Sequence, residues 1–383
     1  MRGLGCNALA YSTIKQYPFY FKATVILFGF VLFVYTLAML RDILVPFSFA
    51  LIIAILLNPL VNQFQRRGVG KIFAIIFSML IALLVFGGIM YFISSQVIGL
   101  SENFPALKAR LYDLLIQLEM WVSSHFGISI AKQVDLINEA LNSSKALVGQ
   151  TVGTAVATIM IVFVLPVYVF LLLFYKTLLL DFLYESFAEK NSTQVADILK
   201  QTKSAIQSYM IGLLIEALIV AAMNSTALLI LGVKYAILLG VIGALLNMLP
   251  YIGGIIAIAL PVLMATVTKD GYSTQLGIII AYIIIQLIDN NFLIPKIVSS
   301  KVQINALISI IIVLLGGALW GVPGMFLSIP FVAIVKIICD RVEGMKPLGK
   351  LLGDEIPTKH KGILWGRKRR KASLSETIIK NAG

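Results

Sequence analysis

Long runs of apolar residues, each close to the length of a membrane-spanning helix, follow one another along most of the chain. In the first half they cover 23–40, 43–61, 72–98 and 151–175. A helix needs about 20 apolar residues to cross a hydrocarbon layer of about 30 Å. These runs therefore predict four membrane-spanning helices before residue 176.

The second half of the chain contains one hydrophobic pattern written twice. In the first copy, a predicted span over 207–231 carries a single acid, Glu216. Two shorter apolar arms, 235–249 and 252–267, follow it and meet at Pro250. The first arm is short for a complete crossing, so these arms are expected to form a helical hairpin.

The second copy repeats this order. A predicted span over 276–294 carries Asp289, and the apolar run over 304–339 is interrupted at 321–324. Asp289 precedes Pro323 by 34 residues, which is also the spacing from Glu216 to Pro250. Each copy thus contains an apolar segment that Gly or Pro interrupts at the corresponding place. In transporters such a pattern indicates the substrate-binding site.

Composition supports a membrane protein. The chain of 383 residues is 59% hydrophobic and 13% charged, with a mean hydropathy of +0.96, whereas soluble domains are about one quarter charged. We expect an all-α multispanning membrane protein with about eight transmembrane helices, in which two Gly/Pro-broken helical hairpins form an inverted repeat.

The distribution of basic residues predicts the orientation. The loop after the second span carries Arg66, Arg67 and Lys71, and 359–371 contains seven basic residues and no acid. Cytoplasmic loops carry the excess of Lys and Arg, so both termini are predicted to be cytoplasmic and the two copies to have opposite orientations. The net charge of +13 is explained in the same way, and nucleic-acid binding is not expected.

The predicted organisation has five parts. In chain order they are N-terminal transmembrane helices over 1–98, an extracytoplasmic amphipathic helical insert over 99–150, a transmembrane helix with a cytoplasmic helical linker over 151–206, a transport core with the inverted repeat over 207–340, and a basic cytoplasmic tail over 341–383. The insert is either a subunit contact or entrance cover, or a cap on the membrane surface. The tail either binds anionic lipid or only fixes the topology.

The two acids are the first candidates for chemistry. Glu216 lies near the middle of its span, whereas Asp289 lies nearer the cytoplasmic end of its own. An ionisable group at membrane depth is costly and is a functional candidate by default. We therefore expect the two acids to differ in role, with Glu216 better suited to proton coupling. The structural alternatives are a hydrogen-bonded strut for Glu216 and an ion pair of Asp289 with Lys296 or Lys301.

The broken hairpins offer free backbone groups that can bind an ion or polar solute, and their glycines permit positive φ angles and close approach. Gln286 and Asn290 are expected to lie side by side, four residues apart on one helix. The candidate ligands of a substrate or ion are Glu216, Asn247, Pro250, Tyr251, Gly253, Gly254, Gln286, Asp289, Asn290, Gly321, Pro323 and Gly324.

Motifs for enzymatic chemistry are absent from the sequence. His125 and His360 lie outside the predicted spans, and there is no P-loop, HExxH or GxSxG pattern. Cys6 and Cys339 stand far apart and indicate neither a disulfide framework nor a metal site. We expect no enzyme, no cofactor and no metal, and hence secondary or passive transport.

Three motifs resemble the autoinducer-2 exporter family, also called PerM-type permeases. They are Leu-Pro-Tyr-Ile-Gly-Gly at 249–254, Asp-Asn-Asn-Phe-Leu-Ile-Pro-Lys at 289–296, and Gly-Gly-Ala-Leu-Trp-Gly-Val-Pro-Gly at 316–324 with Ser-Ile-Pro at 328–330. Many members carry glutamate-glycine-asparagine where this chain has 289–291, which leaves the substrate open. The resemblance implies a homo-oligomeric, pentameric transporter of the inner membrane; some members are assigned to export of the quorum-sensing furanone and others to sodium (lithium)/proton antiport.

Three functions therefore stay open. The first is export of a small polar solute by alternating access between the two broken hairpins. The second is Na⁺(Li⁺)/H⁺ antiport through Glu216 and Asp289. The third is a membrane scaffold without transport, which would need no irregular backbone at membrane depth.

Overall fold

The computed structural model describes residues 18–102, 116, 120, 151–249, 253–269, 271–298 and 304–354. All regular secondary structure in these residues is helical, which confirms the predicted fold class. Six of the described helices are long and apolar enough to cross a membrane, and a bent pair, Phe163–Phe174 with Lys176–Ser186, adds a seventh. The predicted total of about eight transmembrane helices and the predicted inverted repeat both stay predictions.

The first four helices of the described chain form a group of their own. They are α1 (Phe19–Met39), α2 (Arg41–Arg66), α3 (Lys71–Glu102) and α6 (Thr151–Phe174). A cluster of buried apolar side chains joins α2, α3 and α6, whereas α1 contacts α2 and α11 (Ala306–Arg341). None of the residues of α1 is buried, as expected of an apolar helix that faces lipid.

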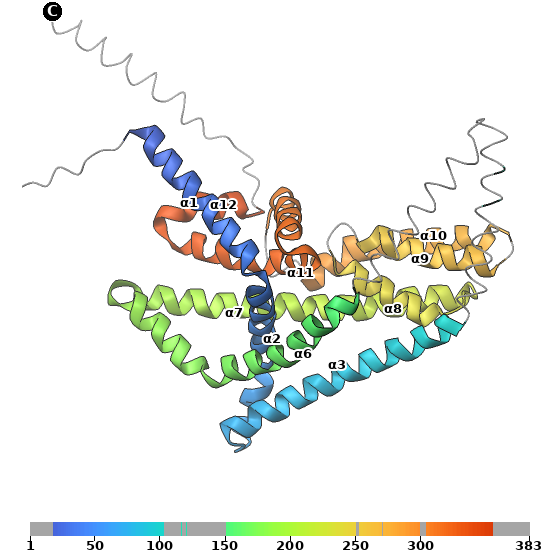
Figure 1. The fold of residues 1–383 in the computed structure, drawn as a ribbon, viewed down its shortest axis with the longest axis horizontal. Helices are drawn as coiled ribbons and strands as arrows, with labels where there is room; N and C mark the ends of the chain where they lie inside the picture. Colours follow the sequence, from blue (N-terminus) through green and yellow to red (C-terminus); the bar gives the residue numbers. More distant parts are fainter. Residues whose placement is uncertain are drawn as a thin grey trace, which may run out of the picture.

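The predicted linker and the span that follows it are one helix by hydrogen bonding, α7 (Lys176–Ile230). Its ribbon doubles back at the left of Figure 1, and the part that qualifies as a membrane span is Thr193–Ile230. The helix that contains the predicted span 207–231 therefore begins among residues that were assigned to the linker.

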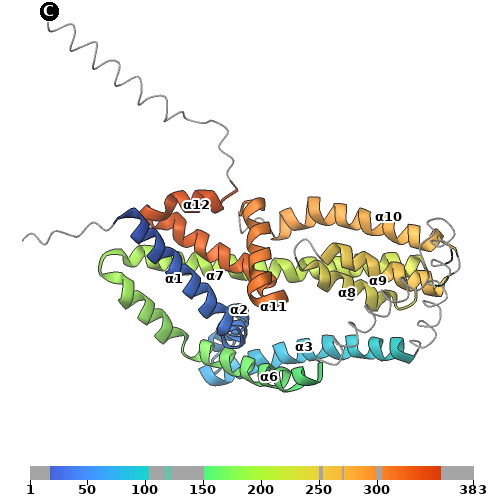
Figure 2. The ribbon, with the colours of Figure 1, turned by 45° about the horizontal axis from the view of Figure 1, so that its top comes forward.

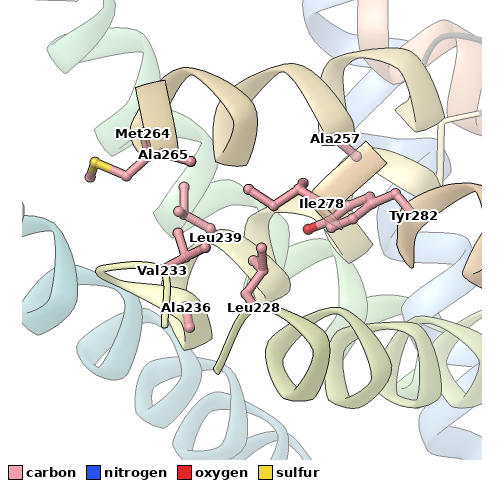
Figure 3. Packing of buried hydrophobic residues seen from close by; sticks show 9 residues of the cluster. All are labelled: Leu228, Val233, Ala236, Leu239, Ala257, Met264, Ala265, Ile278 and Tyr282. Atoms are coloured by element: carbon pink, nitrogen blue, oxygen red, sulfur yellow. The ribbon is translucent and has the colours of Figure 1, made fainter. Parts of the chain in front are cut away.

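The first broken hairpin consists of α8 (Ala236–Asn247) and α9 (Gly253–Thr268), and α10 (Ser273–Ile288) follows it. These helices run roughly parallel to the second half of α7, with α3 on one side of the molecule and α9 and α10 on the other (Figures 1 and 2). Figure 3 shows the side chains that join them: Leu228, Val233, Ala236, Leu239, Ala257, Met264, Ala265, Ile278 and Tyr282. Packing of these apolar side chains holds the hairpin against α7 and α10.

The second broken hairpin is α11 (Ala306–Arg341), which is interrupted at Gly321 with φ 65° and ψ −147°. Its two arms run back along each other: Ser328 Oγ donates to the carbonyl of Ile312 at 3.1 Å, and Gly324 packs against the backbone of Gly316. The chain therefore reverses at the first residue of the predicted break, and Pro323 already belongs to the second arm. Only glycine readily adopts this conformation, while proline is tolerated in the first turn of a helix.

After α11 the chain folds back once more. A short 3-10 helix, Glu343–Met345, leads into α12 (Lys346–Leu352), which packs on α11. The backbone N–H of Asn305 donates a hydrogen bond to the backbone carbonyl of Leu352, with a nitrogen–oxygen distance of 2.9 Å. The first residues of the predicted tail are thus part of the folded core, and the basic run over 359–371 lies outside the described residues, as does most of the predicted insert over 99–150.

Candidate functional site

The two acids of the repeated pattern lie together, joined by one amide. Nδ2 of Asn247 donates to Oε1 of Glu216 at 3.2 Å and to Oδ2 of Asp289 at 2.8 Å. Glu216 is 3% exposed and Asp289 is 1% exposed. We call these three residues the acid–amide cluster. The sequence identified each member as a candidate, but not that they share hydrogen bonds.

Each member of the acid–amide cluster comes from a different element. Glu216 lies on α7, Asn247 is the last residue of α8, and Asp289 begins a π-helix, Asp289–Val298, that continues α10. The π-helix was not predicted. Pro295 is the sequence signal for it, because proline cannot donate to the carbonyl four residues earlier and its ring clashes with that carbonyl. Short π-helical segments inside α-helices occur often at functional sites.

A glycine allows the π-helix to approach α7 next to the acids. A Cβ atom on Gly212 would lie 2.5 Å from the carbonyl oxygen of Ile297, so no larger residue fits there without a shift of the backbone. Gly212 is one helical turn before Glu216 and therefore on the same face of α7. This close contact brings Asp289 within reach of Asn247 and Glu216.

The two acids lie close together, although the sequence places them differently along their spans. The candidate span that contains Asp289 is Ser273–Val298, which extends beyond the predicted 276–294. Sharing one amide also fixes both carboxyl groups within a few ångströms of each other.

The alternative pairing of Asp289 with a lysine finds no support in the described part of the chain. Within the described residues, the ion pairs do not include Asp289, and Nζ of Lys296 lies over the ring of Phe292, 5.8 Å from its centroid. Lys301 lies outside the described residues. The hydrogen-bonded strut expected for Glu216 agrees with its bond to Asn247, so that structural role is compatible with a functional one.

A cavity of about 620 Å³ opens beside the acid–amide cluster. Besides the cluster, its polar lining comes from Tyr209, Gln286, Asn290 and Ser309. Its apolar lining is contributed by α7, the first hairpin, the π-helix and α11, and consists of Leu213, Met248, Leu249, Ile258, Ile294, Val298, Ile304 and Ile329, with Gly254 at the start of α9. The cavity therefore combines two buried acids with a mainly apolar wall.

Half of the predicted ligands line this cavity: Glu216, Asn247, Gly254, Gln286, Asp289 and Asn290. Gln286 and Asn290 are side by side as predicted, with Nε2 of Gln286 donating to Oδ1 of Asn290 at 3.4 Å. Tyr209 and Ser309 were missed. Tyr209 precedes Glu216 by two helical turns and is identifiable from that spacing, whereas Ser309 gives no signal in the sequence.

The remaining candidates do not line the cavity or cannot be placed. Pro250 and Tyr251 lie outside the described residues. Gly253 packs against the backbone of Leu246, so its small size serves the contact between the arms of the first hairpin. Gly321 forms the turn of the second hairpin, Pro323 and Gly324 begin its second arm, and none of the three is among the residues that line the cavity.

Comparisons with known proteins agree with this architecture. The chain is 25% identical over 316 residues to the AI-2 transport protein TqsA of Escherichia coli, which covers 82% of this chain and 90% of TqsA. It is 27% identical over 322 residues to a protein of Haemophilus influenzae named "Putative transport protein". This match covers 82% of this chain and 90% of the relative. The putative transport protein YrrI of Bacillus subtilis is 23% identical over 320 residues. This match covers 78% of this chain and 86% of YrrI.

A family model described as "AI-2E family transporter" matches residues 25–344, which include every helix from α2 to α11. The match therefore spans the acid–amide cluster, the cavity and both broken hairpins. The chain belongs to the AI-2E family of membrane transporters.

Proposed function

We propose that this chain is a secondary transporter that exports a small polar solute through the cavity beside the acid–amide cluster. The observation that carries the proposal is the cavity itself, which ends on two buried carboxyl groups held by one amide. Its volume of about 620 Å³ falls in the range of about 300–1,000 Å³ that is usual for small-molecule sites. A mainly apolar wall with a few convergent polar groups is also typical of such sites.

The relatives suggest the class of solute. TqsA is named an AI-2 transport protein, and export of the quorum-sensing furanone is one of the functions that the family resemblance implies. The amide and hydroxyl groups of Gln286, Asn290, Ser309 and Tyr209 supply both hydrogen-bond donors and acceptors for a small polar solute. AI-2 is therefore the first solute to test.

We propose alternating access as the mechanism, with the two broken hairpins as the elements that move. Met248, next to the turn of the first hairpin, and Trp320, at the turn of the second, pack against the same buried cluster around Tyr209 and Leu213 of α7. Movement of either hairpin would change the packing of this cluster. Tyr209 and Leu213 of the cluster also line the cavity. An inverted repeat supports such motion because two similar units can exchange conformations.

A second candidate function is exchange of Na⁺ or Li⁺ for H⁺ at the acid–amide cluster. A specific observation favours it: the carboxyl groups of Glu216 and Asp289 accept hydrogen bonds from the same amide nitrogen, Nδ2 of Asn247. Two buried carboxyl groups that share a site cannot easily both be charged, so one of them is expected to hold a proton. Hard cations prefer oxygen ligands, and carboxylates are the usual ones. Binding a cation between the acids would therefore displace that proton.

Export and exchange can be separated in proteoliposomes that contain the purified protein. AI-2 release measures export, and a pH-sensitive dye trapped inside measures proton movement when Na⁺ or Li⁺ is added outside. For export we expect AI-2 release that Asp289→Asn weakens and that no longer depends on pH in Glu216→Gln. For exchange we expect a dye response that both changes reduce. Glu185→Gln, an exposed acid at the start of α7, is the matched control and should keep full activity.

The roles of the two acids are tested in the same assay. We expect Glu216→Gln to remove the pH dependence of transport while the protein remains folded, whereas Asp289→Asn should weaken solute or cation binding. A normal pH profile for Glu216→Gln would assign that residue a structural role. Absence of both AI-2 release and dye response in the unchanged protein would favour the scaffold function.

The proposed assembly is a homo-oligomer, a pentamer by family resemblance, in the cell inner membrane with both termini in the cytoplasm. Apolar helices without any buried residue, such as α1, are compatible with contacts to lipid or to another copy. Measuring the mass of the detergent-solubilised protein tests the assembly, and a monomeric mass would contradict it.

A further inference from the structure

A second, much smaller void borders the acid–amide cluster at Asn247 and Asp289. Its volume is about 10 Å³, which is close to the lower limit for holding one water molecule. The residues that matter for its chemistry are Asn224, Gly243, Asn247, Tyr282, Gln286 and Asp289. Asn247 and Asp289 thus border both the large cavity and this void.

Three oxygen atoms at the void have no hydrogen-bond partner among the described residues. They are Oδ1 of Asn224, Oη of Tyr282 and Oδ1 of Asp289. Their side chains are 2%, 4% and 1% exposed, respectively. Buried polar atoms without a partner are costly, and such groups in native proteins are usually satisfied by the protein or by a buried water molecule.

Gly243 makes the room for this void. A Cβ atom at Gly243 would lie 3.3 Å from Nδ2 of Asn224 and 3.5 Å from Oη of Tyr282. Gly243 belongs to α8, whereas Asn224 and Tyr282 belong to α7 and α10. Any larger residue at position 243 would occupy the space between the two polar side chains.

We propose that this void is a binding site for one water molecule, held by Asp289, Asn224 and Tyr282. The water donates its two hydrogens to Oδ1 of Asp289 and Oδ1 of Asn224 and accepts the hydroxyl proton of Tyr282. This arrangement satisfies all three oxygens, and three hydrogen bonds are typical of a buried water. A metal cation fits less well, because hard cations such as Mg²⁺ and Ca²⁺ take about six or more oxygen ligands.

The water extends the acid–amide cluster into the packed core. The ring of Tyr282 belongs to the apolar cluster between α7, α8, α9 and α10 (Figure 3), while its hydroxyl borders the void. Asp289 is then hydrogen-bonded on two sides, to Asn247 through Oδ2 and to the water through Oδ1. The inference concerns the site of the proposed function, but it depends on neither the transported species nor the mechanism.

The direct test is an experimental structure of the whole protein at a resolution that resolves buried water molecules. We expect one density peak within hydrogen-bonding distance of the three oxygens, and the loss of that peak in Gly243→Ala. An empty void, or direct hydrogen bonds between Asn224, Tyr282 and Asp289 that close it, would overturn the proposal. Neither result depends on transport, so it is distinguishable from a failure of the proposed function.

Two solution measurements complement the structure. The infrared C=O band of the buried acids should shift in Tyr282→Phe, because the water loses its donor, and should not shift in Tyr272→Phe, whose side chain is exposed. Any difference in unfolding temperature between NaCl, LiCl and KCl at one ionic strength should be the same in Asn224→Leu as in the unchanged protein. A stabilisation specific to Na⁺ or Li⁺ that Asn224→Leu removes would place a cation in the void and overturn the proposal.

Discussion

The indole nitrogen of Trp320 donates a hydrogen bond to the carbonyl oxygen of Leu37 at 3.0 Å, although the two residues are 283 positions apart. Leu37 lies in the last turn of α1, where backbone carbonyls lack partners within the helix. Trp320 directly precedes Gly321, the point at which α11 reverses. The turn of the second hairpin is therefore attached to the end of the first helix.

Loss of this bond should loosen that attachment without removing the aromatic packing. In the wild type the ring of Trp320 packs edge-on against Phe331, with 6.2 Å between the ring centroids. Trp320→Phe keeps an aromatic ring at this position but removes the hydrogen bond to the carbonyl of Leu37. We expect a loss of about 1 kcal/mol in the free energy of unfolding, measured by denaturant titration in detergent. The conservative change Tyr272→Phe, at a residue that is 85% exposed, serves as control, and equal stability of the two variants would contradict the proposed attachment.

Asn247 should be the least replaceable member of the acid–amide cluster for stability. Asn247→Leu has a similar volume but removes the donor that both carboxyl groups share, so two buried acids lose a hydrogen bond. We expect a cost of at least about 1–3 kcal/mol in unfolding free energy, together with loss of transport. Asn291→Leu is the matched control, because Asn291 is exposed and bonds only within its own helix, to the carbonyl of Leu287 at 2.8 Å. Equal unfolding midpoints for both leucine variants would rule out a central role for Asn247.

Two glycines of the second hairpin should respond to alanine for different reasons. A Cβ atom added at Gly321 would have no neighbour within 4 Å, but this residue has φ +65°, so Gly321→Ala is strained by the backbone alone, at about 1–3 kcal/mol. Gly324 has an ordinary helical conformation, and a Cβ there would overlap the carbonyl of Gly316. Gly324→Ala should therefore separate the two arms.

These two outcomes differ in a crosslinking measurement. Cysteines placed at Ile312 and Ser328, where the Ser328 hydroxyl reaches the backbone carbonyl of Ile312 across the hairpin, should form a disulfide in the Gly321→Ala background and lose it in the Gly324→Ala background. Gly88→Ala, with no neighbour within 4 Å, controls for the general effect of alanine in a helix. A bulky residue at Gly253 or Gly324 should stop transport without preventing insertion, because both glycines lie in close contacts between hairpin arms.

The predicted topology can be tested by labelling from outside the cell. In a background without Cys6 and Cys339, a membrane-impermeant thiol reagent should modify a cysteine at Ser123 and leave one at Ser373 unmodified. The physical reason is the excess of Lys and Arg on the cytoplasmic side, where 359–371 contributes seven basic residues. Modification at both positions, or at Ser373 alone, would reverse the assignment of the termini.

The class of the protein and the two acids of its spans can both be predicted from the amino-acid sequence. Apolar runs long enough to cross a membrane are visible without coordinates because transfer into lipid depends on composition and length within each segment. The same holds for Glu216 and Asp289, which stand out as single acids in apolar runs, and for the helix breaks, which follow from the backbone preferences of glycine and proline.

Which of these residues contact one another becomes visible only in the folded structure. Whether Glu216 and Asp289 share the amide of Asn247 depends on how far each helix is rotated and shifted along its neighbour. That alignment is fixed by close contacts such as Gly212 against Ile297 and by the π-helix that begins at Asp289. The void at Gly243 and the bond from Trp320 to Leu37 have the same origin. Such contacts join residues far apart in the chain, and their geometry results from the packing of all the helices together.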